Sequence, residues 1–199
     1  MKTIETEKYA RMQEVSNFDK LKGNVASTLE TEGVSPMKSL LVVYSYHHNN
    51  TGKVADVIAR VLGSQVKTPQ QTDPDELHEY DLLGFGSGID SDKHYRVLLD
   101  FADKLPQLPD KNVIIFSTSG ITGEEKRVKD HTALREKLRS KGCRIVGEFQ
   151  CRGFNTNSFL GFFGGMNKGR PNAEDLKRAE DFAQDIKQSL QLKQTTPAI

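Results

Sequence analysis

A strand that leads directly into a helix is the feature of this sequence that most restricts its fold. Residues 40–52 read LLVVYSYHHNNTG, in which an apolar run stops in a polar loop, and the helix-like pattern VADVIARVL follows from Val54. The run NVIIF at residues 112–116 is similarly apolar. Strands of a parallel sheet are covered on both faces, so they are apolar throughout instead of alternating. Both runs therefore predict buried parallel strands, and the first predicts a strand that feeds a helix N-terminus.

The alternation of strands and helices continues along the chain. The expected strands are residues 40–44, 65–67, 81–86, 111–117 and 144–151. The expected helices and helical turns are residues 51–62, 73–77, 93–104, 124–141 and 173–192. Five strands that alternate with helices are typical of an α/β fold with a doubly wound parallel sheet, which we place in residues 37–192.

Residues 1–36 differ in composition, being rich in Glu, Lys, Thr and Ser and ending in a turn-like GVSP. Within them apolar residues recur at helical spacing, at Val15, Phe18, Leu21, Val25 and Leu29. We expect an N-terminal helical extension that consists of one amphipathic helix and a linker. The helix would pack on its own domain or contact a partner. Residues 193–199 are expected to form a C-terminal tail.

Charge and composition exclude several classes of protein. The formal net charge is +1 and the charges are interspersed, so there is no basic surface for nucleic acid. No segment approaches the ~18 consecutive apolar residues of a membrane span, and the N-terminus lacks the apolar core of a signal peptide. We therefore expect no membrane span and a cytoplasmic location. Cys143 and Cys151 would lie on one face of a single strand and are expected to be free thiols.

Three loops follow three of the predicted strands. The first is residues 45–51, the second is GFGSGI at 84–89, and the third is STSGI at 117–121. In doubly wound sheets, ligands bind beyond the carboxyl ends of the strands. The first loop brings hydroxyl, amide and backbone N–H groups to a helix N-terminus, where anions bind. The other two would let a flat ligand approach the backbone closely. The simpler alternative is that Asn50 or Thr51 only caps the helix.

Several other sites are excluded by spacing. The run GFGSG is not GxGxxG, and the TGKV of residues 51–54 lacks the upstream glycine and the Ser or Thr of a phosphate-binding P-loop. The strand ends carry no acidic residues of a phosphoacceptor domain. The five histidines have no metal-ligand spacing, and there is no GxSxG nucleophile elbow.

Taken together, SYHHNNTGKVADVIA, GFGSGI, FSTSG and GGMNKGRPNAEDL resemble the flavodoxin family, over about residues 38–186. The resemblance implies a flavodoxin-like fold and FMN as cofactor. Asn50 and Thr51 match the family's phosphate loop, whereas the residues before them differ, and a register that uses Thr51-Gly52 as the Thr-Gly pair is the alternative. The implied contacts are Ser45, Tyr46, His48, Asn49, Asn50 and Thr51 for the phosphate, and Gly86, Ser87, Gly88, Ile89, Ser117, Thr118, Ser119, Gly120 and Ile121 for the ring. We expect Ile89 and Ile121 to replace the aromatic residues that many flavodoxins stack on the ring.

The resemblance implies an electron carrier between redox protein partners. The alternatives are an NAD(P)H-dependent quinone or flavin reductase and a non-redox flavin-binding or interaction module. The near-neutral charge differs from the acidic charge typical of carriers. The uncharged segment GFNTNSFLGFFGGMN, residues 153–167, is too long for an ordinary loop. This segment would cover the flavin or form a homodimer contact; the alternative is a buried hydrophobic segment or an extra edge strand. The N-terminal helix is a second candidate for a homodimer contact.

Overall fold

The computed structural model describes residues 37–156 and 164–195. The predicted N-terminal helix and linker lie outside the described residues, as do most of the uncharged segment's phenylalanines and residues 196–199 of the predicted tail. Among the helices of the described ranges, none is long and apolar enough to cross a membrane.

Five parallel strands form the sheet, as the apolar runs predict. They are β1 (Ser39–Tyr44), β2 (Gln65–Lys67), β3 (Leu82–Asp90), β5 (Asn112–Ser119) and β6 (Arg144–Arg152), in the spatial order β2-β1-β3-β5-β6. Each strand pairs with its neighbour in parallel; Val43, for example, lies opposite Gly86 of β3. Strand order reverses after β2, which makes the sheet doubly wound and places a ligand crevice at the carboxyl ends of β1 and β3.

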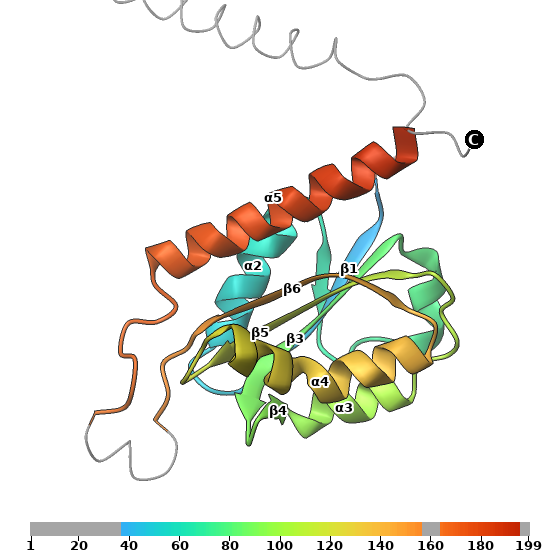
Figure 1. The fold of residues 1–199 in the computed structure, drawn as a ribbon. Helices are drawn as coiled ribbons and strands as arrows, with labels where there is room; N and C mark the ends of the chain where they lie inside the picture. Colours follow the sequence, from blue (N-terminus) through green and yellow to red (C-terminus); the bar gives the residue numbers. More distant parts are fainter. Residues whose placement is uncertain (1–36, 157–163, 196–199) are drawn as a thin grey trace, which may run out of the picture. The chain divides into compact units, whose positions relative to one another are not determined.

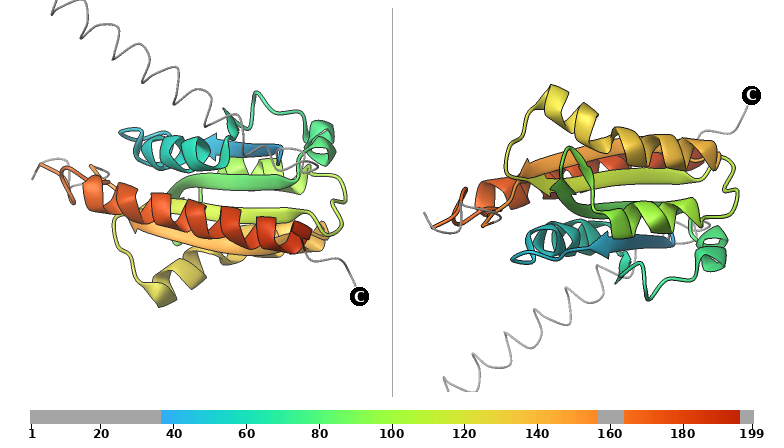
Figure 2. Two further views of the ribbon diagram at one scale, coloured as in Figure 1. Left: turned by 90° about the horizontal axis from the view of Figure 1, so that it is seen from above. Right: turned by 90° about the horizontal axis from the view of Figure 1, so that it is seen from below.

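Helices cover both faces of the sheet. One face carries α2 (Asn50–Leu62) and α5 (Ala173–Thr195), and the other carries α3 (Arg96–Asp103) and α4 (Glu124–Ser140), as Figures 1 and 2 show. A short 3₁₀ helix, Pro74–Glu79, leads into β3. Successive residues of β1 enter opposite cores: Leu40 packs in the cluster under α3 and α4, and Leu41 packs in the cluster under α2 and α5. This two-sided burial is why the strand sequences do not alternate.

The predicted turn at Gly84–Ile89 is wrong. β3 continues through these residues to Asp90 and then pairs in an antiparallel manner with β4 (Lys93–His94). The turn lies further along, at Ser91 and Asp92, which both have positive φ angles of 50° and 62°. The next helix therefore begins at Arg96 and not at Lys93. The glycines of β3 hid the strand from the sequence, because Gly has low strand propensity and is common in turns.

Candidate functional site

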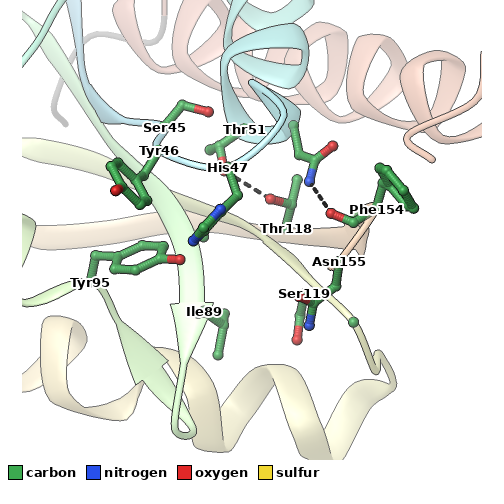
Figure 3. Close-up of a pocket in the computed structure, with 14 residues that line it drawn as sticks. Ser45, Tyr46, His47, Thr51, Ile89, Tyr95, Thr118, Ser119, Phe154 and Asn155 are labelled. Carbon is green, nitrogen blue, oxygen red and sulfur yellow. Dashed lines mark hydrogen bonds between the residues drawn. The ribbon is translucent and has the colours of Figure 1, made fainter. Parts of the chain in front are cut away.

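A small hollow of about 40 Å³ opens at the carboxyl end of the sheet. Figure 3 shows that its walls come from the loop after β1, from β3, from the start of α3, from the end of β5 and from the chain after β6. The lining residues are Ser45, Tyr46, His47, Asn50, Thr51, Gly88, Ile89, Tyr95, Thr118, Ser119, Gly120, Gly153, Phe154 and Asn155.

The N-terminus of α2 forms one end of the hollow. Its N-cap residue, Asn49, is in the left-handed region with φ 51° and makes no side-chain capping hydrogen bond, and the first turn of the helix contains no acidic residue. The backbone N–H of Gly52 donates to Ser45 Oγ at 3.1 Å, which fixes the loop. A Cβ atom at residue 52 would lie 1.9 Å from Asn49 Oδ1, so a larger residue there would displace the exposed Asn49 side chain. No acidic residue in the first turn therefore compensates the positive end of the helix dipole, which is suited to an anion.

Asn50 and Thr51 join this loop to other walls of the hollow. Thr51 Oγ1 lies 2.8 Å from Thr118 Oγ1 at the end of β5, and Asn50 Nδ2 donates to the carbonyl oxygen of Phe154 at 2.8 Å. Figure 3 draws both hydrogen bonds. Asn50 Oδ1 is buried and has no hydrogen-bond partner among the described residues. Because a buried polar atom is costly when unpaired, this oxygen is suited to accept a hydrogen bond from a ligand hydroxyl.

Aromatic side chains stand at the opposite end of the hollow. Tyr95, the residue before α3, lies edge-to-face on Tyr44 with ring centroids 5.6 Å apart. Tyr46 lies edge-to-face on His47 at 4.6 Å and is 68% exposed. Figure 3 shows Tyr46, Tyr95 and Ile89 around the same space. Aromatic side chains are therefore present beside Ile89 in the hollow, and the expected contact of Ile89 with the ring stays a prediction.

Nine of the fifteen predicted contacts line the hollow, and six do not. Those that do are Ser45, Tyr46, Asn50, Thr51, Gly88, Ile89, Thr118, Ser119 and Gly120. His48 is exposed, stacks on Phe154 with centroids 4.5 Å apart and lies 2.8 Å from Thr156 Oγ1, while Asn49 is exposed at the N-cap. Ile121 is 63% exposed. Gly86, Ser87 and Ser117 are buried within the strands and do not line the hollow.

Five lining residues were missed from the sequence: His47, Tyr95, Gly153, Phe154 and Asn155. Tyr95 was placed inside a helix that begins one residue later. Gly153 lies close under the first loop, since a Cβ there would be 3.0 Å from Asn50 Nδ2. A glycine two residues after the end of a predicted strand was the available signal for this close approach.

The described residues contain no group of three His, Cys, Asp or Glu side chains that could hold a metal ion. What the hollow offers is an anion-binding helix N-terminus at one end, an unpaired amide oxygen in the middle and aromatic rings at the other end. This arrangement fits the phosphate, the hydroxylated chain and the flat ring system of FMN.

Comparison with known proteins agrees with the resemblance to the flavodoxin family that the sequence motifs indicate. The family model of the flavodoxin domain matches residues 41–188. An uncharacterized protein of Methanocaldococcus jannaschii is 42% identical over 150 residues, which cover 75% of this chain and 98% of the relative. A flavodoxin from the domain Archaea matches with a TM-score of 0.53 at 19% identity, covering 78% of this chain and 99% of that one. The rubredoxin oxygen:oxidoreductase of Desulfovibrio gigas matches with a TM-score of 0.58 at 16% identity, covering 81% of this chain and 38% of that one.

The strand order and the two helical layers define a flavodoxin-like protein. The match of the family model over most of the chain goes further: the chain belongs to the flavodoxin family. The resemblance stated from the sequence motifs is thus confirmed.

Proposed function

We propose that this protein binds FMN and carries electrons between redox protein partners. The observation that carries the proposal is the hollow itself, which combines an uncompensated helix N-terminus with aromatic side chains at the other end of one small space. In such a protein the flavin supplies the redox chemistry, and the chain determines its binding, exposure and electronic environment.

The residues of the hollow have distinct roles in this proposal. The loop of Ser45 and Thr51 holds the 5′-phosphate at the N-terminus of α2, where backbone N–H groups and the helix dipole act together. Asn50 Oδ1 accepts a hydrogen bond from a hydroxyl of the ribityl chain. Tyr46 and Tyr95 contact the ring, and Gly88 and Gly120 let backbone groups approach its polar edge.

An NAD(P)H-dependent FMN reductase is the second candidate. A net charge of +1 favours it over a carrier, because carriers that steer basic partners depend on a strongly acidic surface. The two candidates share the cofactor and differ in the electron donor. If NAD(P)H alone rapidly bleaches the bound flavin, the reductase is correct; if reduction requires a reductase protein, the carrier is correct.

The FMN assignment is tested with a phosphate comparison. Thr51→Val should weaken FMN by about tenfold to a hundredfold, since hydrogen bonds to a charged group contribute about 1.5–3 kcal/mol. Riboflavin, which lacks the phosphate, should lose much less. Thr132→Val, on the outer side of α4, is the matched control and should leave both affinities unchanged. Absence of any spectral change on FMN titration of the wild-type protein, or equal losses for FMN and riboflavin in the variant, would refute the assignment.

A further inference from the structure

A chain of buried polar side chains lies beneath the hollow, between the sheet and α4. Ser117 Oγ is 2.8 Å from His131 Nε2, and His131 Nδ1 is 2.9 Å from Glu148 Oε2. Arg135 holds Glu148 with two hydrogen bonds, from Nε at 2.6 Å and from Nη2 at 2.7 Å. Ser117 and His131 are fully buried, whereas Glu148 keeps 16% of its side chain exposed. The imidazole of His131 therefore connects a buried hydroxyl to a carboxylate at the surface.

The hydrogen-bond pattern assigns the protons of this chain. Burial would raise the pKa of Glu148, but the hydrogen bonds from His131 and Arg135 outweigh it and lower that pKa to about 2, so the carboxylate is ionised. An ionised carboxylate only accepts hydrogen bonds, so His131 Nδ1 carries a proton. Gln150 Nε2 donates to Ser117 Oγ at 3.2 Å, which leaves the Ser117 hydroxyl free to donate to His131 Nε2. Both ring nitrogens of His131 thus have a hydrogen-bond partner when Nδ1 alone carries a proton.

The same cluster can accommodate one more proton on His131. Once Nε2 is protonated it donates to Ser117 Oγ, which has two lone pairs and can accept from His131 and Gln150 together. The counter-ion, Glu148, is already hydrogen-bonded to the other ring nitrogen. Gln150 Oε1 is buried without a hydrogen-bond partner among the described residues, so the cluster contains a spare acceptor.

A second imidazole, that of His94, limits this cluster to one extra charge. Its ring centroid lies 5.0 Å from that of His131. Burial and the neighbouring His131 hold the pKa of His94 well below its ordinary value. Ser87 Oγ lies 2.9 Å from His94 Nδ1 and donates to the carbonyl oxygen of Gly88 at 2.8 Å, so His94 Nδ1 is the donor to Ser87. His94 therefore stays neutral, and any additional proton is held by His131.

The cluster is in direct contact with the floor of the hollow. Ser87 Oγ also accepts a hydrogen bond from the backbone N–H of Tyr95 at 3.2 Å. Gly88 and Tyr95 both line the hollow, as does Thr118, the residue after Ser117. A charge that appears in the hollow would therefore act on His131 through a water-poor interior, where electrostatic interactions are stronger than in water.

The other charges around His131 are already paired. Asp130, which is fully buried, pairs with Lys126, and Asp92 pairs with Lys126 at 3.1 Å and Lys129 at 2.7 Å. Arg127 pairs with Glu124. A new negative charge in the hollow thus has no unused cation in this cluster, and protonation of His131 is the available response. The titratable groups in contact with this imidazole are Glu148 of β6 and His94 of the β3–β4 hairpin. The charged groups that surround them, from α4 and the hairpin, are Arg127, Arg135, Lys126, Lys129, Asp130 and Asp92.

We propose that His131 takes up a proton when the bound flavin is reduced, with Glu148 as its counter-ion. This inference rests on the FMN-binding function proposed above. With dithionite as reductant, dithionite is oxidised to sulfite and supplies two electrons. The oxidised flavin takes both electrons and one proton from water, and His131 Nε2 takes a second proton from water. The negative charge that the flavin gains is balanced by the positive charge of the imidazolium.

The test is the pH dependence of the flavin midpoint potential. Each proton taken up in a two-electron reduction adds about 30 mV per pH unit to the slope, because a tenfold change in an equilibrium constant corresponds to about 30 mV for such a couple. The FMN-loaded full-length protein should therefore have a slope about 30 mV per pH unit steeper than that of His131→Gln around neutral pH. A pH indicator in weak buffer should record about one more proton taken up per flavin reduced in the wild-type protein than in the variant.

Two further variants complete the test. Glu148→Gln removes the counter-ion and should also flatten the slope, and it decides the question if His131→Gln does not fold. His78→Gln changes an exposed histidine at the opposite end of the sheet and should keep the wild-type slope. Equal slopes and equal proton uptake in the wild-type protein, His131→Gln and Glu148→Gln would overturn the inference while leaving FMN binding intact. Failure to bind FMN at all would overturn both proposals.

Discussion

The hydrogen bonds that His131 and Arg135 donate to Glu148 lead to a quantitative prediction about acid stability. The pKa of Glu148 falls from an ordinary value of 4.5 to about 2 in the folded protein. At about 1.4 kcal/mol for each pKa unit, the carboxylate contributes up to about 3 kcal/mol to the free energy of unfolding at neutral pH. With only 16% of the side chain exposed, solvent screens this contribution little. We therefore expect Glu148→Gln to lower the free energy of unfolding by about 2–3 kcal/mol at neutral pH.

The sign of the pH dependence follows from the direction of the shift. Because the folded-state pKa is lower than the unfolded one, the stabilisation is complete above 4.5 and is lost as the pH falls toward 2. Near pH 3.5 the unfolded state already binds the proton and the folded state does not, so about 1 kcal/mol of the difference between wild type and Glu148→Gln should have disappeared. At that pH, protonation of Glu148 in the unfolded wild-type chain reduces the stabilisation that Glu148→Gln lacks at every pH.

Urea unfolding followed by circular dichroism, at several pH values, measures both free energies. Urea is preferred to guanidinium chloride because the latter is a salt and would screen the ion pair. Asp185→Asn, an exposed carboxylate on α5, is the control and should change stability by no more than about 0.5 kcal/mol at any pH. A Glu148→Gln effect that is as small as the control, or that is constant from neutral pH to about pH 3.5, would refute the reasoning.

Three further predictions concern other positions. Gly86→Ala should destabilise the fold by about 1–3 kcal/mol or more, because the new Cβ would lie 2.2 Å from the buried ring of Phe116. Gly123→Ala is the control: no atom lies within 4 Å of its Cβ, so it should be nearly neutral in the same urea titration. Gly153→Ala should weaken FMN several-fold with little effect on melting temperature, as its Cβ would push against the loop after β1; unchanged affinity would contradict the position of this wall. Burial raises the pKa of Cys143 to about 11 and that of Cys151 to about 12, so neither thiol should react with an alkylating reagent until the protein is unfolded, and rapid labelling of the native protein followed by mass spectrometry would contradict this.

The parallel sheet was predictable from the sequence because two-sided burial leaves a direct trace in composition. Every residue from Leu40 to Val43 enters one of the two cores, so the run is continuously apolar. The first loop was also predictable, since a polar stretch between a buried strand and an amphipathic helix has few other conformations. The β3–β4 hairpin was not predictable, because β3 contains three glycines. In addition, its turn consists of Ser91 and Asp92, two residue types that do not favour the positive φ angles that they adopt here.

The alternation of side chains along a strand explains why part of the predicted site does not line the hollow. Ser117 and Thr118 are neighbours in sequence, but consecutive residues of a strand point to opposite faces. Thr118 faces α2 and meets Thr51, whereas Ser117 faces α4 and meets His131. The motif STSG therefore contributes to two different structures, and its hydroxyl groups alone do not show which residue belongs to which. The buried histidines were missed for the same reason, since their partners are brought together only by the fold.

Because hydrogen bonds join the first loop to the chain after β6, the pocket can be completed only late in the synthesis of the chain. Asn50 bonds to Phe154 and His48 to Thr156, over 104 and 108 positions of the sequence. While the ribosome is still synthesising β6, the loop after β1 has emerged but its closing wall has not. A nascent or truncated chain therefore lacks a finished pocket, and cofactor capture would distinguish completed molecules from fragments.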